Sequence, residues 1–223
     1  MAHPYITAIQ KEFTALANPT IAAGAKAYLL HQFEFYGLQT PERRKICKAF
    51  YKANPVNNHT ELTKIIKEAF NEPQRELHYF AIELLSHHHA LWTSKTITLI
   101  EWMLTHNSWW DSVDSTNSNV IGKYFIQFPE LLENTTNKWN LSSNFWLQRM
   151  SILFQLSYKE KTNTELLEKY IVNRMDTNEF FVNKAIGWAL RAYAYTHKKW
   201  VIRFVQDHPQ LSNLSKREAL RHV

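Results

Sequence analysis

Short amphipathic stretches interrupted by proline are the feature that most limits what this chain can fold into. Apolar residues recur at intervals of three and four, the spacing that lines one face of an α-helix. Proline, often after asparagine, interrupts the pattern at positions 19, 55, 73, 129 and 209, and a proline removes a backbone donor and blocks the preceding helical turn. The 223 residues include only four glycines and seven prolines, too few turn-formers for many short strands. The sequence therefore predicts an all-α fold.

The expected helices follow one another with brief polar turns between them. They run over about 5–16, 20–33, 41–53, 62–70, 77–89, 97–107, 109–128, 145–156, 166–175, 180–195 and 199–206, with one more start at 215. Such a succession predicts stacked antiparallel helix pairs, with a pair spacing in the range of HEAT-type repeats. No linker or low-complexity tract divides the chain. We therefore expect a single domain, 1–223, built as one continuous α-solenoid.

The charge balance indicates the class of partner. The formal net charge is +6, which favours an anionic partner, nucleic acid first. An anionic membrane surface is the competing interpretation, but no segment has the uncharged apolar span of a membrane helix. The N-terminal segment lacks the apolar core of a signal peptide, and the single cysteine, Cys47, is typical of a reducing compartment. We expect a cytoplasmic protein that is not associated with a membrane.

The stretch Ser108–Asp114 combines two tryptophans with two carboxylates at the start of a helix. Trp110 and Asp114 are four residues apart and so share one helix face. Ser108 is predicted to be the N-cap, with Asp111 at the third helical position completing a capping arrangement. That role accounts for Asp111 but leaves Asp114 beside a tryptophan face without a capping function.

Asp114 has two interpretations that the spacing leaves open. A carboxylate beside an aromatic face can stabilise a cationic species or activate a water molecule. Alternatively, Asp114 pairs with a buried arginine and Trp110 is part of the core. Arg149, in a mostly apolar helix, requires such an anion, either a carboxylate such as Asp114 or an external phosphate.

The segment Phe180–Arg191 carries a second polar face. Lys184, Trp188 and Arg191 fall on one side of the expected helix, while apolar residues serve the core. A tryptophan between two cations suits a sugar-phosphate backbone, although Trp188 can equally cover a gap between repeats. Gly187 costs about 1 kcal/mol in a helix relative to alanine, so we expect another group to approach closely there.

Other chemical signatures are weak or missing. The sequence has no phosphate-binding glycine loop, no nucleophile elbow and no zinc-protease motif. The run His87–His89 does not predict a metal site, because consecutive helical residues point in different directions and histidine suits the last turn of a helix. Cys47 lies in an amphipathic stripe, where packing is the expected role rather than nucleophilic attack.

Several long motifs together resemble one family, the AlkD-type bacterial alkylpurine DNA glycosylases built from HEAT-like repeats. The resemblance covers nearly the whole chain. The motifs are YGLQTPERR, SWWDSVDS, NFWLQR-x-x-ILFQL, EFF-x-x-KAIGWALR and LSKREAL. It implies a right-handed solenoid whose concave basic face binds duplex DNA and which releases cationic bases such as N3-methyladenine and N7-methylguanine. The family is known to act while the lesion stays stacked, whereas glycosylases generally flip the base into a pocket.

The resemblance also implies roles for individual residues. Asp114 would be the catalytic carboxylate, Trp110 and Trp188 would pack against the deoxyribose backbone, and Arg149 would hold DNA or orient the site. Tyr28 and Gln39 match family positions near the opposing DNA. The further residues expected to bind DNA are Lys184, Arg191, Lys216 and Arg217. No metal or organic cofactor is expected, because a cationic base is already a good leaving group.

Two other functions remain open at this point. A non-catalytic HEAT-repeat protein that binds branched or damaged DNA would share the basic charge and the solenoid, but it has no evident use for a carboxylate facing phosphate. A protein-protein scaffold is a common use of α-solenoids and would bind DNA weakly. The resemblance implies a monomer. It also places DNA contacts near the end of the chain in doubt if the family's last helix continues past Val223.

Overall fold

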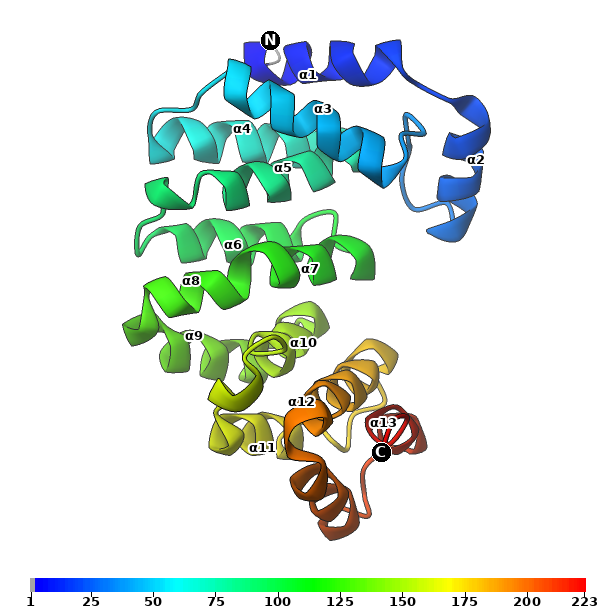
Figure 1. Ribbon diagram of the computed structural model, residues 1–223, viewed down its shortest axis with the longest axis vertical. Helices are drawn as coiled ribbons and strands as arrows, with labels where there is room; N and C mark the ends of the chain where they lie inside the picture. Colours follow the sequence, from blue (N-terminus) through cyan, green and yellow to red (C-terminus); the bar gives the residue numbers. More distant parts are fainter. Residues whose placement is uncertain (1–2) are drawn as a thin grey trace. The chain divides into compact units, whose positions relative to one another are not determined.

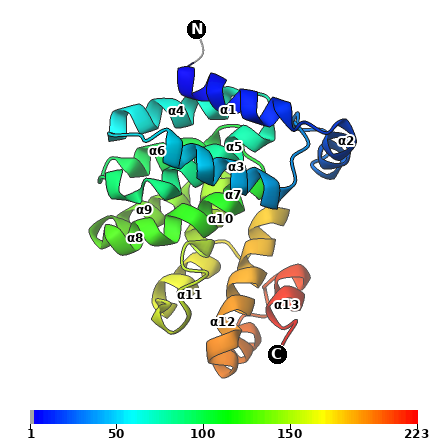
Figure 2. The same ribbon diagram turned by 45° about the horizontal axis from the view of Figure 1, so that its top comes forward.

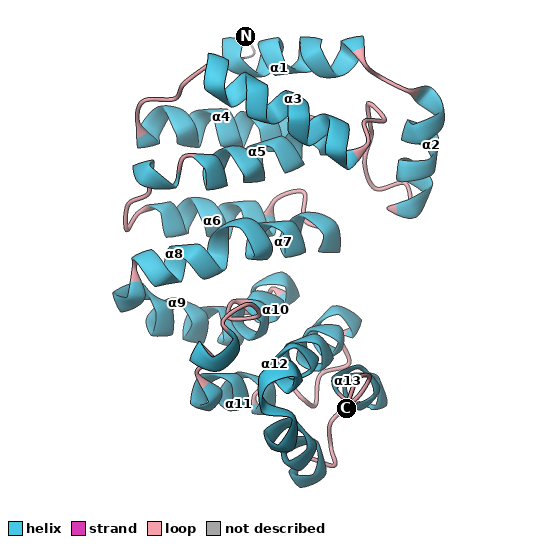
Figure 3. Cartoon of the chain, viewed as in Figure 1, coloured by secondary structure: helices cyan, strands magenta, loops and turns pink. Residues whose placement is uncertain are grey.

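The computed structural model describes residues 3–223, and helices account for most of them (Figures 1 and 3). Within that range the one strand-type interaction is an isolated parallel bridge between Glu34 and Gln74. The prediction of an all-α fold is therefore confirmed. No helix within residues 3–223 has the length and apolar character needed to cross a membrane.

Contacts between residues divide the chain into two compact units, residues 1–107 and 108–223. We call them the N-terminal and C-terminal units. The single domain, the right-handed superhelix and the concave basic face stay predictions.

The N-terminal unit is a stack of short helices around a core of aliphatic and aromatic side chains. Its elements are α1 (Pro4–Ala15), α2 (Pro19–Tyr28), α3 (Thr40–Ala53), α4 (His59–Asn71), α5 (Arg75–His87), the 3₁₀ turn η1 (His89–Leu91) and α6 (Thr96–Thr105). Helix α4 packs against α1, α5 and α6, and α3 packs against α1 and α5 (Figure 2). Phe13, Phe70 and Phe80 are completely buried between these helices. The three-residue connection between α4 and α5 makes this pair antiparallel, as predicted.

A buried carboxylate fixes the turn before α3. Glu76 of α5 accepts hydrogen bonds from the backbone N–H groups of Tyr36, Gly37 and Leu38, at 3.1, 2.8 and 3.2 Å. Gly37 has φ +88°, and a Cβ there would lie 2.1 Å from the Asn18 carbonyl oxygen. Only glycine fits a backbone that is both left-handed and so closely approached. This turn sets the position of the exposed residue Gln39, which follows it directly.

The C-terminal unit is built around two central helices, α10 and α12. Its elements are α7 (Trp110–Thr116), the π-helical turn η2 (Asn117–Ile121), α8 (Gly122–Gln127), α9 (Pro129–Leu141), α10 (Phe145–Leu153), the 3₁₀ turn η3 (Lys159–Lys161), α11 (Thr164–Val172), α12 (Phe180–Asp207) and α13 (Asn213–Ala219). Helix α10 packs against α9, α11 and α12, and α13 packs against α12. Non-helical dihedral angles at His197 divide α12, in agreement with the two helices predicted over 180–195 and 199–206.

Several predicted helix starts are wrong by a few residues. The N-cap of α7 is Trp109, which has no side-chain capping hydrogen bond, so the capping arrangement predicted from Ser108 to Asp111 does not form. Helix α3 begins at Thr40 instead of 41, with Gln39 as its N-cap. The cap of α13 is Ser212, whose side chain accepts from the Ser215 N–H.

One predicted length needs correction, and one helix is missing from the prediction. Helix α2 ends at Tyr28 instead of near 33, because Leu30 and His31 adopt φ values of +55° and +58°, which end a right-handed helix. The helix α9, from Pro129, was not predicted: its proline stands at the first turn, where proline is tolerated, instead of marking only a boundary.

The contact expected at Gly187 is present, and it joins α12 to α13. A Cβ at Gly187 would lie 2.5 Å from the Glu218 Cβ and 2.9 Å from the Ser215 carbonyl oxygen. The Ser215 hydroxyl also donates to the Asn183 carbonyl at 2.9 Å. The missing side chain therefore allows the two helix backbones to touch.

We predict that Gly187→Ala lowers the unfolding midpoint in urea, because the added methyl group forces α13 away from α12 at a cost of about 1–3 kcal/mol. The matched control is Gly24→Ala in α2, where a Cβ meets nothing within 4 Å. There the substitution should raise stability by about 0.5–1 kcal/mol. A Gly187→Ala protein as stable as the unmodified one would contradict the close approach.

Candidate active site

The two tryptophans at the start of α7 occupy different environments. Trp109 packs into an aromatic cluster, with its ring 5.5 Å from Phe181 and 6.2 Å from Trp146. Trp110, one residue later, lines an open cavity together with Asp114. Residues four apart on a helix share a face, and the structure confirms this for Trp110 and Asp114. The first tryptophan thus anchors the helix, and the second lies at the site.

Arg149 of α10 is the anchor of the Asp114 carboxylate. Its Nε and Nη2 atoms each donate to one carboxylate oxygen of Asp114 at 2.8 Å, and its Nη1 donates to the Phe181 carbonyl. The Arg149 side chain is 5% exposed and that of Asp114 is 19% exposed. The anion that Arg149 requires is therefore Asp114, and the guanidinium orients this carboxylate. One side of the carboxylate remains open to the cavity.

The π-helical turn after α7, the helix of Asp114, is hydrogen-bonded to α10. The side chain of Asn117, the first residue of the π-helical turn, donates to the Leu153 carbonyl at 2.9 Å. The Tyr158 hydroxyl donates to the Gly122 carbonyl at 2.7 Å. A π-helical turn commonly lies near a functional site. Here the first bond ties the turn to the last residue of α10, and the second ties the start of α8 to the segment that follows α10. The same contacts therefore keep Asp114 in register with Arg149.

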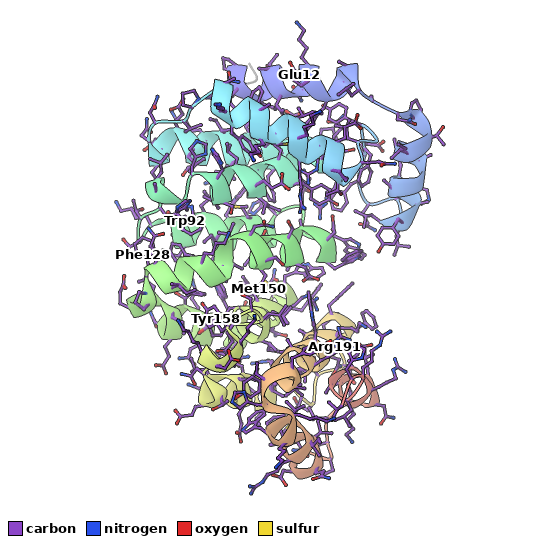
Figure 4. The ribbon with its side chains drawn as sticks, viewed as in Figure 1. Glu12, Trp92, Phe128, Met150, Tyr158 and Arg191 are labelled. Carbon is purple, nitrogen blue, oxygen red and sulfur yellow. The ribbon has the colours of Figure 1, made fainter. Side chains whose placement is uncertain are left out.

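Helix α12 supplies the opposite wall of the cavity. Trp188 is half-buried, and the Arg149 guanidinium carbon lies 5.8 Å from the centre of its ring, a cation–π contact. Lys184 and Arg191 both contact the Glu218 carboxylate of α13, at 3.0 and 2.6 Å. Arg191 is labelled in Figure 4, on α12 beside α13. The predicted polar face of this helix is thus confirmed as a surface of the cavity.

The cavity has a volume of about 380 Å³ and lies entirely within the C-terminal unit. The side chains that line it come from α7, α10, α12 and α13. They are Trp110, Asp114, Arg149, Phe180, Phe181, Lys184, Trp188, Arg191 and Glu218. Three cations and two carboxylates leave a local charge of one positive unit at neutral pH. The four residues predicted to be catalytic therefore meet at one place, although they come from three helices.

The other residues predicted to bind DNA lie outside this cavity. Tyr28, at the end of α2, is 70% exposed, and Gln39 is exposed before α3; both belong to the N-terminal unit. In α13, Arg217 is exposed, whereas the Lys216 ammonium donates to the Pro209 carbonyl at 2.6 Å. The part that these four residues play in binding stays a prediction.

The sequence-based prediction missed three residues of the cavity. Phe180 and Phe181 begin α12, and Phe181 also contributes the backbone carbonyl that Arg149 binds. At Glu218 the sequence pattern predicts only part of the helix that starts at 215. The glycine at 187 indicated a close neighbour, but the pattern could not say which residue it was. A backbone acceptor such as the Phe181 carbonyl leaves no signal in the residue type.

The remaining candidate groups have packing roles. The Cys47 thiol is buried, and burial raises its pKa to about 11, so the reactive thiolate is scarce at neutral pH. The rings of His87 and His88 lie 4.9 Å apart, edge to face, and each of the three rings at 87–89 also has a neighbour of its own. His87 packs against Tyr51, His88 contacts the Leu84 carbonyl and His89 lies near Trp92.

Comparison with known proteins identifies the family. The family model described as DNA alkylation repair enzyme matches residues 9–223. The chain belongs to the DNA alkylation repair enzyme family. A solved structure described as a predicted DNA alkylation repair enzyme from Enterococcus faecalis is 32% identical, with a TM-score of 0.87, and the alignment covers 93% of this chain and 96% of that one. No curated protein matches the chain.

Membership of this family gives the chain a role in the repair of alkylated DNA, and DNA is accordingly its binding partner. The site in the C-terminal unit is compatible with such a partner, because it combines cations with exposed aromatic surface.

We predict that the contribution of Glu218 to stability is lost in acid. The hydrogen bond and the charge of Lys184, followed by the charge and the hydrogen bond of Arg191, hold the pKa of this carboxyl below its ordinary value of 4.5. The unfolded chain therefore takes up the proton at a higher pH than the folded one. The stabilisation is full above about pH 4.5 and disappears as the pH falls through the lower pKa of the folded state.

Urea unfolding of the unmodified protein and of Glu218→Gln at a series of pH values measures this effect. The stability difference between them should be largest near neutral pH and shrink on acidification. Glu168→Gln, an exposed position of α11, is the control with the same change in charge. A difference that stays constant down to pH 3 would contradict the ion-pair contribution.

Proposed function

We propose that the protein is a monofunctional DNA glycosylase that hydrolyses the N-glycosidic bond of cationic alkylated purines, such as N3-methyladenine and N7-methylguanine, in duplex DNA. The observation that carries the proposal is the Asp114 carboxylate, held on two oxygens by Arg149 and partly open to a cavity walled by Trp110 and Trp188. A charge fixed in this way needs no reorganisation when positive charge develops beside it. The enzyme works as a monomer in base excision repair, in the cytoplasm at the nucleoid.

The reaction requires little help at the leaving group. In an N7-methylated guanine the base carries the positive charge, so cleavage of the C1′–N9 bond sends the bonding electrons to the base and releases it neutral. The positive charge moves to the sugar as an oxocarbenium-like species. Asp114 stabilises that charge and orients a water molecule, whose oxygen forms the new bond to C1′ while its proton passes to the carboxylate or to solvent. The product is an abasic site.

The aromatic walls act on the sugar rather than on the base. Trp110 and Trp188 present flat surfaces on which a deoxyribose packs. In the proposed mechanism the lesion stays stacked in the duplex, as in the family that the sequence resembles. Selection then comes from the weakness of the glycosidic bond in a cationic base.

Asp114→Asn is the sharpest test of this function. We expect the release of N7-methylguanine from methylated duplex DNA to fall by at least about 100-fold, the usual cost of losing an electrostatic group in the transition state. The measurement is single-turnover release, with chromatography to identify the free base. Asp176→Asn, at an exposed position between α11 and α12, removes the same charge away from the cavity and is the control. Release at the unmodified rate by Asp114→Asn would show that the carboxylate is not catalytic.

The dependence of DNA binding on salt tests the expected DNA surface. Arg217→Gln should weaken binding to duplex DNA uniformly and reduce the slope of log affinity against log salt by about one, as one phosphate contact is lost. Arg203→Gln is the matched control, because Arg203 is 84% exposed and pairs with Asp207 on its own helix.

A slope near zero for the unmodified protein would support a protein scaffold. Strong binding without release of any methylated base would support a non-catalytic binder of branched or damaged DNA.

A further inference from the structure

Glu218 is a buried carboxylate at the edge of the site, and the proposed reaction gives it no role. It is 8% exposed and lies on α13. One of its oxygens contacts the Lys184 ammonium at 3.0 Å, and the other accepts from Arg191 Nη1 at 2.6 Å. A single carboxylate therefore holds both cations of the α12 wall.

The position of Glu218 depends on the gap at Gly187. Lys184 and Arg191 are seven residues apart, about 10 Å along a helix, with Trp188 between them. A carboxylate reaches both cations only if its own backbone lies against the helix midway between them. The Glu218 Cβ meets that condition, because a Cβ at Gly187 would lie only 2.5 Å from it. Gly187 thus leaves room for the Glu218 backbone, and the Glu218 carboxylate bridges the two cations on either side of Trp188.

The cations remain available to a second anion. The side chains of Lys184 and Arg191 are 38% and 21% exposed, whereas that of Glu218 is 11% exposed. Ammonium has three N–H donors and guanidinium has five, so the contacts with Glu218 leave donors for an incoming ligand. All three side chains line the cavity, and the two cations are more exposed than the carboxylate that holds them. Phosphate oxygens are the anions that arginine and lysine bind in DNA complexes.

The same arrangement limits the positive charge near Asp114. Without Glu218, two mobile cations would lie beside a site where positive charge develops on a sugar, and they would oppose it. With Glu218 in place, the ion pairs offset part of this charge and fix its location. The pKa of the carboxyl is lowered by the same contacts, so it is ionised at neutral pH.

We propose that Glu218 is a positioning residue, which holds Lys184 and Arg191 on either side of Trp188 so that they bind the phosphates of the strand whose deoxyribose packs on that indole. The inference rests on the proposed function for the identity of the strand. Glu218 itself touches neither the sugar nor the base; it acts through the two cations.

Glu218→Gln tests this role, because it keeps the volume and removes the charge. We expect single-turnover release of N7-methylguanine to fall roughly tenfold to a hundredfold, the effect of a misplaced binding group. Affinity for undamaged duplex DNA should be unchanged or higher, since one negative charge is lost. Glu168→Gln, which removes the same charge from the surface of α11, should leave release at the unmodified rate. Release and affinity that fall together with the unfolding midpoint would indicate a structural role and overturn the proposal, and so would an increase of both.

A double-mutant cycle shows whether Glu218 acts through the cations. In a Lys184→Gln, Arg191→Gln background, adding Glu218→Gln should lower release no further, because residues that act as one unit are not additive. An equally large additional loss would mean that Glu218 acts by another route, and the proposal would be wrong. The cycle is informative even if each variant loses some stability, because all four proteins are compared at a temperature where all are folded.

A binding measurement separates failure of this inference from failure of the proposed function. A duplex containing a tetrahydrofuran abasic analogue keeps the sugar and its two phosphates but has no base to release. We expect the unmodified protein to prefer this duplex over an intact one, and Glu218→Gln to lose the preference while keeping its affinity for intact duplex. If the unmodified protein released no base, the proposed function would be wrong, and the preference for the abasic duplex would still test the positioning role of Glu218. A preference retained in Glu218→Gln would overturn the positioning role alone.

Discussion

The guanidinium of Arg149 lies almost completely buried on α10, and a buried charge has to be matched by an anion and by hydrogen bonds. Three contacts meet that requirement: two with the Asp114 carboxylate of α7 and one with the Phe181 carbonyl of α12. Removal of either charged partner of such a pair typically costs about 3–5 kcal/mol. The pair therefore sets the register of three helices. It also presents the carboxylate that the proposed reaction needs in one orientation.

The site depends on a second contact of a different kind. Helix α13 reaches α12 only because Gly187 has no side chain, and the Ser215 hydroxyl bonds to the Asn183 carbonyl beside it. This approach places Glu218 between two cations that flank Trp188. Buried ion pairs contribute little net stability once desolvation is counted, but they can favour one arrangement over its alternatives. Both walls of the cavity are thus held by carboxylates that contact arginine.

Much of the fold follows from the sequence because helices are governed by local spacing. Stripes at intervals of three and four predicted most of the helices, and the shared face of Trp110 and Asp114 follows from four residues of separation. The helix ends were predicted less well, because the N-cap depends on the direction in which the chain approaches the helix. The N-cap of α7, for example, is Trp109 and not Ser108. Helix α9 was missed because Pro129 can either end a helix or begin one.

The sequence by itself determined which residues required an interaction partner that their own helix does not supply. Arg149 required an anion, Gly187 required a close neighbour, and Asp114 had no capping function to perform. Only the tertiary structure decided which groups are the partners. In the sequence, Asp114 and Arg149 are 35 residues apart, and Arg191 and Glu218 are 27 residues apart. Contacts over such separations depend on how helices pack, which no local spacing encodes. The division of the two adjacent tryptophans, Trp109 to the aromatic cluster and Trp110 to the cavity, was settled in the same way, by the helices that pack around α7.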